Sequence, residues 1–513
     1  MSDFFTTTNI VIVAAIILYL IGMLLIGFHF SKKNASSSDF YLGGRKLGPF
    51  VTAMSAEASD MSSWLLMGLP GVAYLTGVCD AFWTALGLAL GTWVNWLIVA
   101  RRLRRYSANI DAVTVPSFFV KRWHDKRNLL NAVSAVVIIV FFIPYTASGF
   151  AACGKLFNSL FGADYMVAMI VSAIIIVLYT TLGGFLAAST TDFIQSIVMS
   201  IALVVVLGYG TWSVGGFDVV LQNAQSLAGY LALNATHDVS TGGSNTYSAL
   251  TIVSTLAWGL GYFGMPHILL RFMAIEDAKK LVLSRRIATV WVCISMSVAI
   301  IIGATGLAMS EAGVLGVLEG SASENVIVQI SALIAQHGIF PAMVTGVILA
   351  GILAATMSTS DSQLLTAASG VSENIVREFF GIKLKEKEGL MIARVTVVVI
   401  SLLAIFFAQN PDSSVFQIVS FAWAGFGGAF GAVMLSALFW KRSNWQGALA
   451  GMIAGGAMTF IWKYGVRPLG GVFDIYELLP AFLFSAIVLV CVSLATPAPS
   501  EEIVAEFEQA KNG

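Results

Sequence analysis

Charged residues are scarce in this sequence. Of its 513 residues, 58% are hydrophobic and 11% are charged, with a mean hydropathy of +0.85, whereas a soluble domain has about 25% charged residues. No polar segment of domain size separates the apolar stretches, so the composition excludes a string of soluble domains and indicates one membrane domain. The net charge of zero gives no electrostatic basis for binding nucleic acid.

Catalytic and metal-binding motifs are also missing. The five histidines are dispersed, and neither a zincin motif nor a nucleophile elbow occurs. The cysteines lie in or beside apolar runs, without CxxC or metal-ligand spacing, at Cys79, Cys153, Cys293 and Cys491. The tail after Thr496 is too short for a signalling domain. We therefore expect a protein that is not an enzyme, with a membrane sensor or membrane enzyme as the less favoured alternative.

Apolar stretches long enough to cross a bilayer recur along the chain. A spanning helix needs about 20 mainly apolar residues, and about thirteen stretches meet this criterion. They lie at residues 9–29, 48–77, 81–101, 128–157, 165–184, 188–211, 249–272, 287–310, 340–371, 390–408, 414–440, 445–463 and 478–497. We expect an all-α polytopic membrane protein whose first stretch is a retained helix, because no small-residue cleavage signature follows that stretch.

Lysine and arginine are absent from two long loops, residues 212–247 and 310–336. Basic residues resist translocation and collect in cytoplasmic loops. In the predicted topology they cluster in alternate loops and in the tail, and the exceptions are Lys155, Lys463 and Arg467. This alternation predicts an N-terminus outside the cell and a C-terminus in the cytoplasm.

Two predicted spans are interrupted at membrane depth. The span at 48–77 carries Glu57 and Asp60, and a carboxylate at mid-membrane costs about 2.5–3.5 kcal/mol on insertion scales. The span at 249–272 contains Gly264 and Pro266, which favour a break because proline removes a backbone donor. Interruptions persist in a membrane only where they line a cavity or are buried. Broken segments in corresponding positions of two halves indicate a transporter site.

A third polar cluster, residues 354–361, lies in the predicted span at 340–371. Its adjacent residues Ser358 and Thr359 could bond the carbonyl four residues earlier in their own helix. Their oxygens could also bind sodium, a hard ion that prefers oxygen ligands, together with carbonyls freed by an unwound second span.

Several long stretches resemble the sodium/solute symporter family, and within it the sodium/proline symporters. They include LGGRKLGPFVTAMSAEASDMSSWLLMGLPG (42–71), FFIPYTASG (141–149), WGLGYFGMPHILLRFMA (258–274), ILAATMST (352–359) and FAWAGFGGAFG (421–431). The resemblance implies a LeuT-type fold of two inverted five-helix repeats with broken second and seventh helices. Its parts would be an extra helix at 9–29, repeats at 48–211 and 249–440, two further helices at 445–497, and a cytoplasmic tail at 498–513.

The resemblance also implies a sodium site between the second and ninth spans. Its ligands would be the carbonyl oxygens of Ala58, Met61 and Ala355 and the hydroxyls of Ser358 and Thr359. Three other residues match supporting positions of the family: Asp60 beside the site, Asp192 on the cytoplasmic exit route of sodium, and Arg45, which affects coupling.

For the solute, the resemblance implies a site near the same break. Ser62, Ser63 and Trp64 would lie on the carboxylate side of proline, and its ring would be enclosed by Tyr145, Trp258, Tyr262 and Pro266. A single tryptophan or tyrosine is more often a packing or interfacial residue. The sequence departs from the family pattern at Ser63 and Met265, where Gly and Gln are expected, and at Glu57, which could be titratable or pair with a basic neighbour.

These features together predict sodium-coupled symport of L-proline by alternating access in a bacterial plasma membrane. Sodium is the expected co-transported ion, and the expected partners are proline, sodium and the lipid bilayer, without nucleic acid. The alternative is a sodium-coupled symporter of another small amino acid or carboxylate solute.

Overall fold

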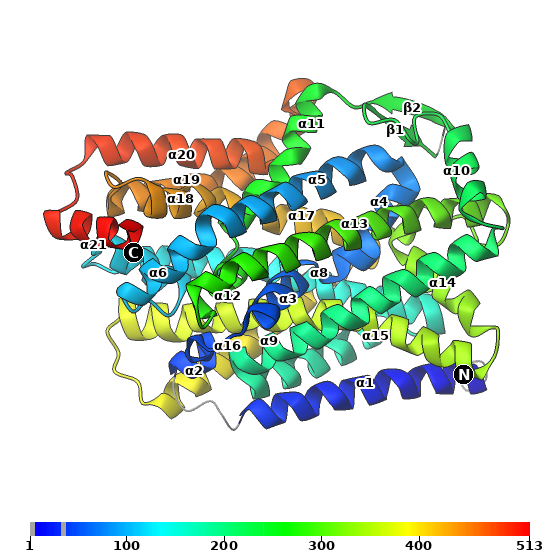
Figure 1. The fold of residues 1–513 in the computed structure, drawn as a ribbon, viewed down its shortest axis with the longest axis horizontal. Helices are drawn as coiled ribbons and strands as arrows, with labels where there is room; N and C mark the ends of the chain where they lie inside the picture. The colour runs from blue at the N-terminus through cyan, green and yellow to red at the C-terminus, as the bar shows by residue number, and fades with distance from the viewer. Residues whose placement is uncertain (1–5, 32–36, 240, 513) are drawn as a thin grey trace.

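Helices dominate the structure, a computed structural model that describes residues 6–31, 37–239 and 241–512. Most of the long helices run along the long axis of the molecule (Figure 1). Within those ranges, nine helices are long and apolar enough to cross a membrane. The prediction of an all-α polytopic membrane protein is therefore confirmed, while the number of thirteen spans stays a prediction.

The first half of the chain supplies ten α-helices and three short helical segments. They are α1 (Thr7–Ser31), α2 (Ser37–Leu42), η2 (Gly43–Arg45), α3 (Pro49–Asp60), η3 (Trp64–Gly68), α4 (Leu69–Thr76), α5 (Val78–Val94), η4 (Asn95–Ala100), α6 (Arg101–Asn109), α7 (Val115–Trp123), α8 (Leu129–Phe161), α9 (Tyr165–Ser213) and α10 (Phe217–Ser226).

An antiparallel hairpin, β1 (Ala235–Asp238) with β2 (Gly243–Thr246), precedes the second half. The remaining elements are α11 (Ala249–Leu256), η5 (Ala257–Phe263), α12 (Pro266–Ala274), η6 (Ala278–Lys280), α13 (Leu281–Glu311), η7 (Gly320–Asn325), α14 (Val326–Ala335), α15 (Ile339–Ser369), η8 (Gly370–Phe379), α16 (Glu386–Phe407), α17 (Val415–Phe426), η9 (Gly427–Gly431), α18 (Ala432–Phe439), α19 (Trp445–Ile461), η10 (Trp462–Val466), η11 (Arg467–Leu469), η12 (Gly471–Phe473), α20 (Leu478–Ala495) and α21 (Glu501–Asn512).

The loops without lysine or arginine are folded rather than extended. Residues 212–247 contain α10 and the β-hairpin, and residues 310–336 contain η7 and α14. In Figure 1, α10, the hairpin and α14 lie toward the right end of the molecule, whereas the arginine-rich α6 and the C-terminal α21 lie toward the left. The two ends therefore differ in basic content, as the charge alternation predicts.

Both interrupted spans are broken in the structure. The first leaves helical geometry at Met61 (φ −73°, ψ 12°) and resumes through η3 into α4. The second ends η5 at Gly264, passes through the extended residue Met265 (ψ 107°) and restarts at Pro266. Proline is favourable at that first helical position because its missing N–H would be unpaired there anyway. The prediction of broken second and seventh helices is confirmed.

The predicted spans at 165–184 and 188–211 form one long element, α9, which changes direction inside. The interruption is at Gly184, whose φ of 67° and ψ of −176° lie outside the helical region. Glycine adopts this conformation readily because it has no Cβ. The second part of α9 packs on α15, and both contact α3. This packing brings polar residues of α3, α9 and α15 to one place.

Candidate functional site

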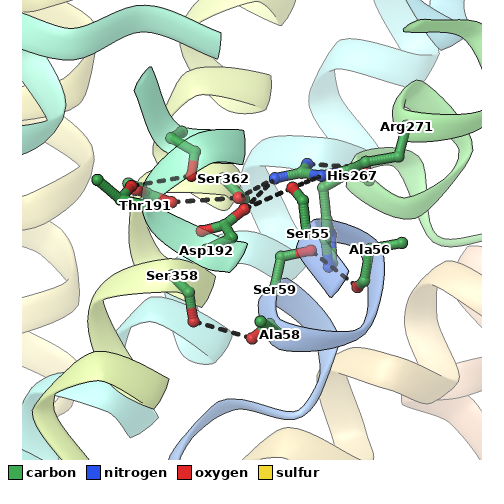
Figure 2. A network of polar contacts seen from close by, with 12 residues as sticks. Ser55, Ala56, Ala58, Ser59, Thr191, Asp192, His267, Arg271, Ser358 and Ser362 are labelled. Carbon is green, nitrogen blue, oxygen red and sulfur yellow. Dashed lines mark hydrogen bonds and ion pairs between the residues drawn. The ribbon is translucent and has the colours of Figure 1, made fainter. Parts of the chain in front are cut away.

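The break after α3 lies against the polar part of α15. The Ser358 hydroxyl donates a 2.8 Å hydrogen bond to the carbonyl oxygen of Ala58, and Figure 2 shows the two pointing toward one another. Ser358 Oγ and Thr359 Oγ1 each lie 3.1 Å from the carbonyl oxygen of Ala355. Bonds within the same helix account for the Ala355 contacts, as expected of serine and threonine. They do not account for the bond to Ala58, which joins two helices.

Ala58 can accept this bond because α3 is about to end. Carbonyl groups in the last turn of a helix lack some of their intrahelical partners. The chain bends at Met61, whose N–H closes the final turn on the carbonyl of Glu57 at 2.8 Å. Four of the five predicted sodium-ligand residues thus lie in one buried cluster of contacts, and the fifth, Met61, is buried at the bend. Binding of sodium by these oxygens stays a prediction.

Asp60 links the two broken helices. Its carboxylate Oδ2 accepts a 2.6 Å hydrogen bond from the hydroxyl of Tyr262 in η5. Its backbone carbonyl accepts bonds from the Tyr145 hydroxyl at 3.1 Å and from Trp64 Nε1 at 3.3 Å. Asp60 is buried, and it forms no ion pair with any residue that the structure describes. A buried carboxyl group without a basic partner is neutralised either by a proton or by a cation bound nearby.

Aromatic rings pack together beside these groups. Trp64 stacks on Trp258 with ring centroids 6.1 Å apart, and Tyr262 meets Trp423 edge-on at 5.0 Å. The indole N–H of Trp423 donates a 2.8 Å bond to the carbonyl of Trp258. We call the group Trp64, Trp258, Tyr262, Phe416, Trp423 and Tyr476 the aromatic cluster.

Two glycines, one in η5 and one directly after it, are required by this packing. A Cβ on Gly261 would lie 1.9 Å from Trp423 Nε1, and one on Gly264 would lie 2.2 Å from the carbonyl oxygen of Phe426. The glycines therefore let α17 approach the broken helix. Phe416, Trp423 and Tyr476 were not predicted as site residues. Only Trp423 had a signal, since it belongs to the family-like stretch 421–431.

The predicted carboxylate-side residues follow directly after the bend. Ser62 Oγ accepts a 3.2 Å bond from the Trp64 N–H. Ser63 is fully buried, and its hydroxyl has no hydrogen-bond partner among the residues that the structure describes. A buried unpaired hydroxyl costs about 1–3 kcal/mol, so a ligand that bonds it recovers that energy. Pro266 begins α12, directly after the fully buried Met265.

Asp192 belongs to a separate polar network between α3, α9, α12 and α15 (Figure 2). Its Oδ2 is 3.0 Å from Arg271 Nη2 and accepts a 2.6 Å bond from the Ser55 hydroxyl. Arg271 also donates to Ser362 Oγ at 2.5 Å and to the carbonyl of His267 at 2.8 Å. Arg271 is buried, and it forms an ion pair with Asp192.

Arg45 lies apart from both the break after α3 and the Asp192 network. Its guanidinium bonds the carbonyls of Met273, Ala112 and Ser107 at 2.7, 2.6 and 3.1 Å. Partial burial and the nearby Arg104 lower the pKa of Arg45 to about 10, so it stays charged at neutral pH. Arg45 ties the end of α12 to the turn after α6, and does not contact the predicted sodium ligands.

Glu57 has no basic partner in the described part of the chain. Its Oε1 accepts bonds from Trp96 Nε1 at 2.9 Å and from the Thr92 hydroxyl at 3.0 Å, and its Oε2 has none. The alternative that Glu57 pairs with a basic neighbour is therefore wrong. The side chain points to α5 and η4 rather than to α15, because Glu57 and Ala58 are adjacent in one helix and face different neighbours.

Known proteins resemble this chain over nearly its whole length. The osmoregulated proline transporter OpuE of Bacillus subtilis is 43% identical over 96% of this chain and 96% of that protein. The sodium/proline symporter of Escherichia coli is 40% identical over 96% of this chain and 94% of that protein.

Solved structures share the fold at low sequence identity. A substrate-bound, outward-open sodium-coupled sialic acid symporter is 17% identical and superimposes with a TM-score of 0.78, covering 96% of this chain and 99% of that one. The complex of MhsT with L-phenylalanine is 14% identical with a TM-score of 0.52, covering 88% and 99%. These similarities confirm the fold class.

The family model described as the sodium:solute symporter family matches residues 40–455. This range contains every residue predicted above for the sodium site, its supporting positions and the solute site. The prediction of a transporter rather than an enzyme is confirmed by the family and by the named relatives. The chain belongs to the sodium:solute symporter family.

Proposed function

We propose that this protein couples the inward movement of sodium to the uptake of L-proline by alternating access. The observation that supports this proposal is that the break after α3 contacts both the predicted sodium-ligand residues and the aromatic cluster. In the last turn of α3, just before Met61, Ala58 bonds Ser358 of α15 and Asp60 bonds Tyr262 of the aromatic cluster. A cation that orders the break would therefore also order the solute site. Bound sodium would thus raise the affinity for proline. Because binding free energies are linked, bound proline would raise the affinity for sodium by the same factor.

For sodium, the proposed ligands are the carbonyls of Ala58, Met61 and Ala355 with the hydroxyls of Ser358 and Thr359. These oxygens are neutral, so they do not cancel the positive charge of the ion. Asp60, the nearby carboxylate without a basic partner, would offset that charge in a buried setting where Coulomb interactions are strong.

For the solute, we place the carboxylate of proline near Ser62, Ser63 and Trp64, where the chain leaves helical geometry. The unpartnered hydroxyl of Ser63 supports this placement. The apolar ring would lie against Trp258 and Tyr262, with Tyr145 and Pro266 completing the enclosure. The names of the relatives support proline as the solute.

We further propose an N-terminus outside the cell, a C-terminus in the cytoplasm, and inverted repeats at residues 48–211 and 249–440. The bacterial plasma membrane is supported by the organisms of the relatives. In this arrangement, the Asp192 network and the Arg45 contacts would close the cytoplasmic route and would separate when sodium leaves.

The test is uptake of labelled proline by proteoliposomes with an imposed sodium gradient, with and without an ionophore that collapses it. We expect gradient-dependent accumulation, and loss of most of it in the double variant Ser358→Ala, Thr359→Ala. Ser369→Ala is the matched control, because among the described residues this buried α15 hydroxyl bonds the carbonyl of Thr366, within its own helix. Absence of gradient-dependent accumulation would overturn proline symport, whereas full activity of the double variant would overturn the sodium placement. Competition by unlabelled amino acids and carboxylates tests the alternative solutes.

A further inference from the structure

The basic residues that do not follow the cytoplasmic clustering all bind carboxylates. Lys155 Nζ lies 2.8 Å from Glu324, Lys463 Nζ lies 3.4 Å from Glu477, and Arg467 Nη1 lies 3.0 Å from the second oxygen of Glu477. Both carboxylate side chains are at least 96% buried. Each exception to the charge alternation is therefore explained by a specific ion pair.

Glu477 stabilises the connection between α19 and α20 through ion pairs. It is the residue before α20, and it receives Lys463 from η10 and Arg467 from η11. Arg467 also donates to Asp474 at 2.9 Å, so the two ends of the connection are held together. We call residues 463–477 the α19–α20 connection. It lies outside both predicted repeats.

The neighbour of Glu477 extends into the aromatic cluster. The Tyr476 ring stacks on Trp258 with centroids 5.0 Å apart and planes at 23°. Its hydroxyl donates a 2.7 Å bond to the carbonyl of Ser420 in α17, and its N–H donates a 2.6 Å bond to Ser254 Oγ in α11. Figure 1 shows the orange α19–α20 connection against the outer end of α11.

Tyr476 is the ring of the aromatic cluster that lies nearest to Trp258. Trp64, Phe416 and Trp423 lie 6.1, 5.5 and 6.4 Å from the Trp258 ring, and Tyr476 is nearer than any of them. Tyr476 is only 8% exposed, so its ring is buried against this site. Moving the connection would carry Tyr476 away and remove the stacking partner of Trp258.

We infer that the α19–α20 connection is a lid over the aromatic cluster, locked by Glu477 with Lys463 and Arg467, and that Tyr476 is a positioning residue for the solute. Tyr476 acts through Trp258, which it holds in place against a small amino acid with an apolar ring. The positioning role rests on the proposed function, because it takes Trp258 as a wall of the solute site. The lid itself does not need that assumption.

The lid is tested without any solute. Cysteine introduced as Ser420→Cys keeps the backbone carbonyl that Tyr476 bonds, and its side chain replaces a buried one. In purified protein, we expect a hydrophilic thiol reagent to label this cysteine at least about tenfold faster when Tyr476→Ala or Glu477→Gln is added. Tyr476→Phe keeps the ring, and Asp474→Asn removes only an exposed partner of Arg467, so both are controls with unchanged labelling. Labelling of the protein without Ser420→Cys is subtracted.

The positioning role is tested by proline uptake at varied proline and saturating sodium. Tyr476→Ala is expected to raise the KM for proline at least about tenfold, and Tyr476→Phe to restore it to within about threefold. Arg467→Gln, a change at a partly exposed residue, provides a second variant if Glu477→Gln is poorly produced. Unchanged labelling in every lid variant overturns the lid, and an unchanged KM in Tyr476→Ala overturns the positioning role. A wild-type protein that takes up no proline counts against the proposed function, while the labelling result still decides the lid.

Discussion

The hydroxyl of Tyr262 donates a 2.6 Å hydrogen bond to Asp60 Oδ2 across 202 positions of sequence. This bond joins the two broken helices at their interruptions, and both partners are buried. A hydrogen bond to a charged group contributes about 1.5–3 kcal/mol. It is therefore a direct physical link between the proposed sodium site and the aromatic cluster.

Tyr262→Phe removes this link while keeping the ring. We expect the ratio of the maximal rate of proline uptake to its KM to fall by about tenfold or more, because a buried carboxylate loses its hydrogen-bond donor. The apparent sodium affinity is expected to fall with it, since the two sites are coupled. Initial rates over a grid of sodium and proline concentrations measure both.

Tyr247→Phe is the matched control, because Tyr247 bonds the carboxylate of Asp80 at 2.8 Å outside this site. An equal loss in both variants would show that the effect is a general consequence of removing a tyrosine hydroxyl from a carboxylate.

Ser63→Ala deletes the buried hydroxyl that has no partner among the described residues. Because a buried hydroxyl without a partner costs about 1–3 kcal/mol and no bond is broken within the protein, we expect the free energy of unfolding to stay the same or to rise by up to about that amount. Proline affinity is expected to fall several-fold if the solute carboxylate bonds this hydroxyl. Thermal unfolding and equilibrium binding of labelled proline measure the two effects, and unchanged affinity removes Ser63 from the solute site.

Asp192→Asn removes the carboxylate that pairs with the buried Arg271 guanidinium. Breaking a buried ion pair in this way costs about 3–5 kcal/mol, so the unfolding temperature in detergent should fall clearly. Adding Arg271→Met should restore part of the loss because it removes the charge that lost this partner. Glu276→Gln is the control, since its pair with Lys280 is exposed and such pairs contribute about 0–1 kcal/mol. A double variant less stable than Asp192→Asn alone would contradict this account.

Phe507→Ala tests how the C-terminal helix α21 is held. The Phe507 ring is buried between the guanidinium groups of Arg102 and Arg122, each 4.9 Å from its centroid. Burial of a phenylalanine contributes about 1.5–3 kcal/mol, which is enough to dock a short helix. We expect limited proteolysis to remove the tail faster in the variant, while the unfolding temperature of the remaining chain changes little. Val504→Ala, at a less buried position of the same helix, should leave proteolysis nearly unchanged.

Much of the fold follows from local chemistry. Glycine and proline in 258–266 and the carboxylates in 57–60 predicted two broken helices, and the structure breaks them at Met61 and Gly264–Met265. The apolar runs predicted an all-helical membrane protein. The division of α9 at Gly184 was anticipated as two separate spans. These features depend on residues close together in sequence, so a linear pattern contains them.

The composition of the aromatic cluster could not be predicted in this way. In an apolar chain with 12% aromatic residues, the sequence does not distinguish a tryptophan that packs in the core from one that lines a binding site. Phe416, Trp423 and Tyr476 meet Trp258 only because α17 and the α19–α20 connection fold against η5. The pairing of Asp192 with Arg271 likewise depends on the packing of α9 on α12 through α3.

The sequence by itself determined the membrane-embedded helical class, the two helix breaks and the unequal distribution of basic residues, because each is set by the affinity of short segments for water, lipid or helical geometry. The tertiary structure alone decided which distant groups meet: Ser358 with Ala58, Tyr262 with Asp60, and Tyr476 with Trp258. It also explained Lys155, Lys463 and Arg467, whose position against the charge pattern is stabilised by buried carboxylates. Such pairings depend on how helices pack in three dimensions, which no local pattern contains.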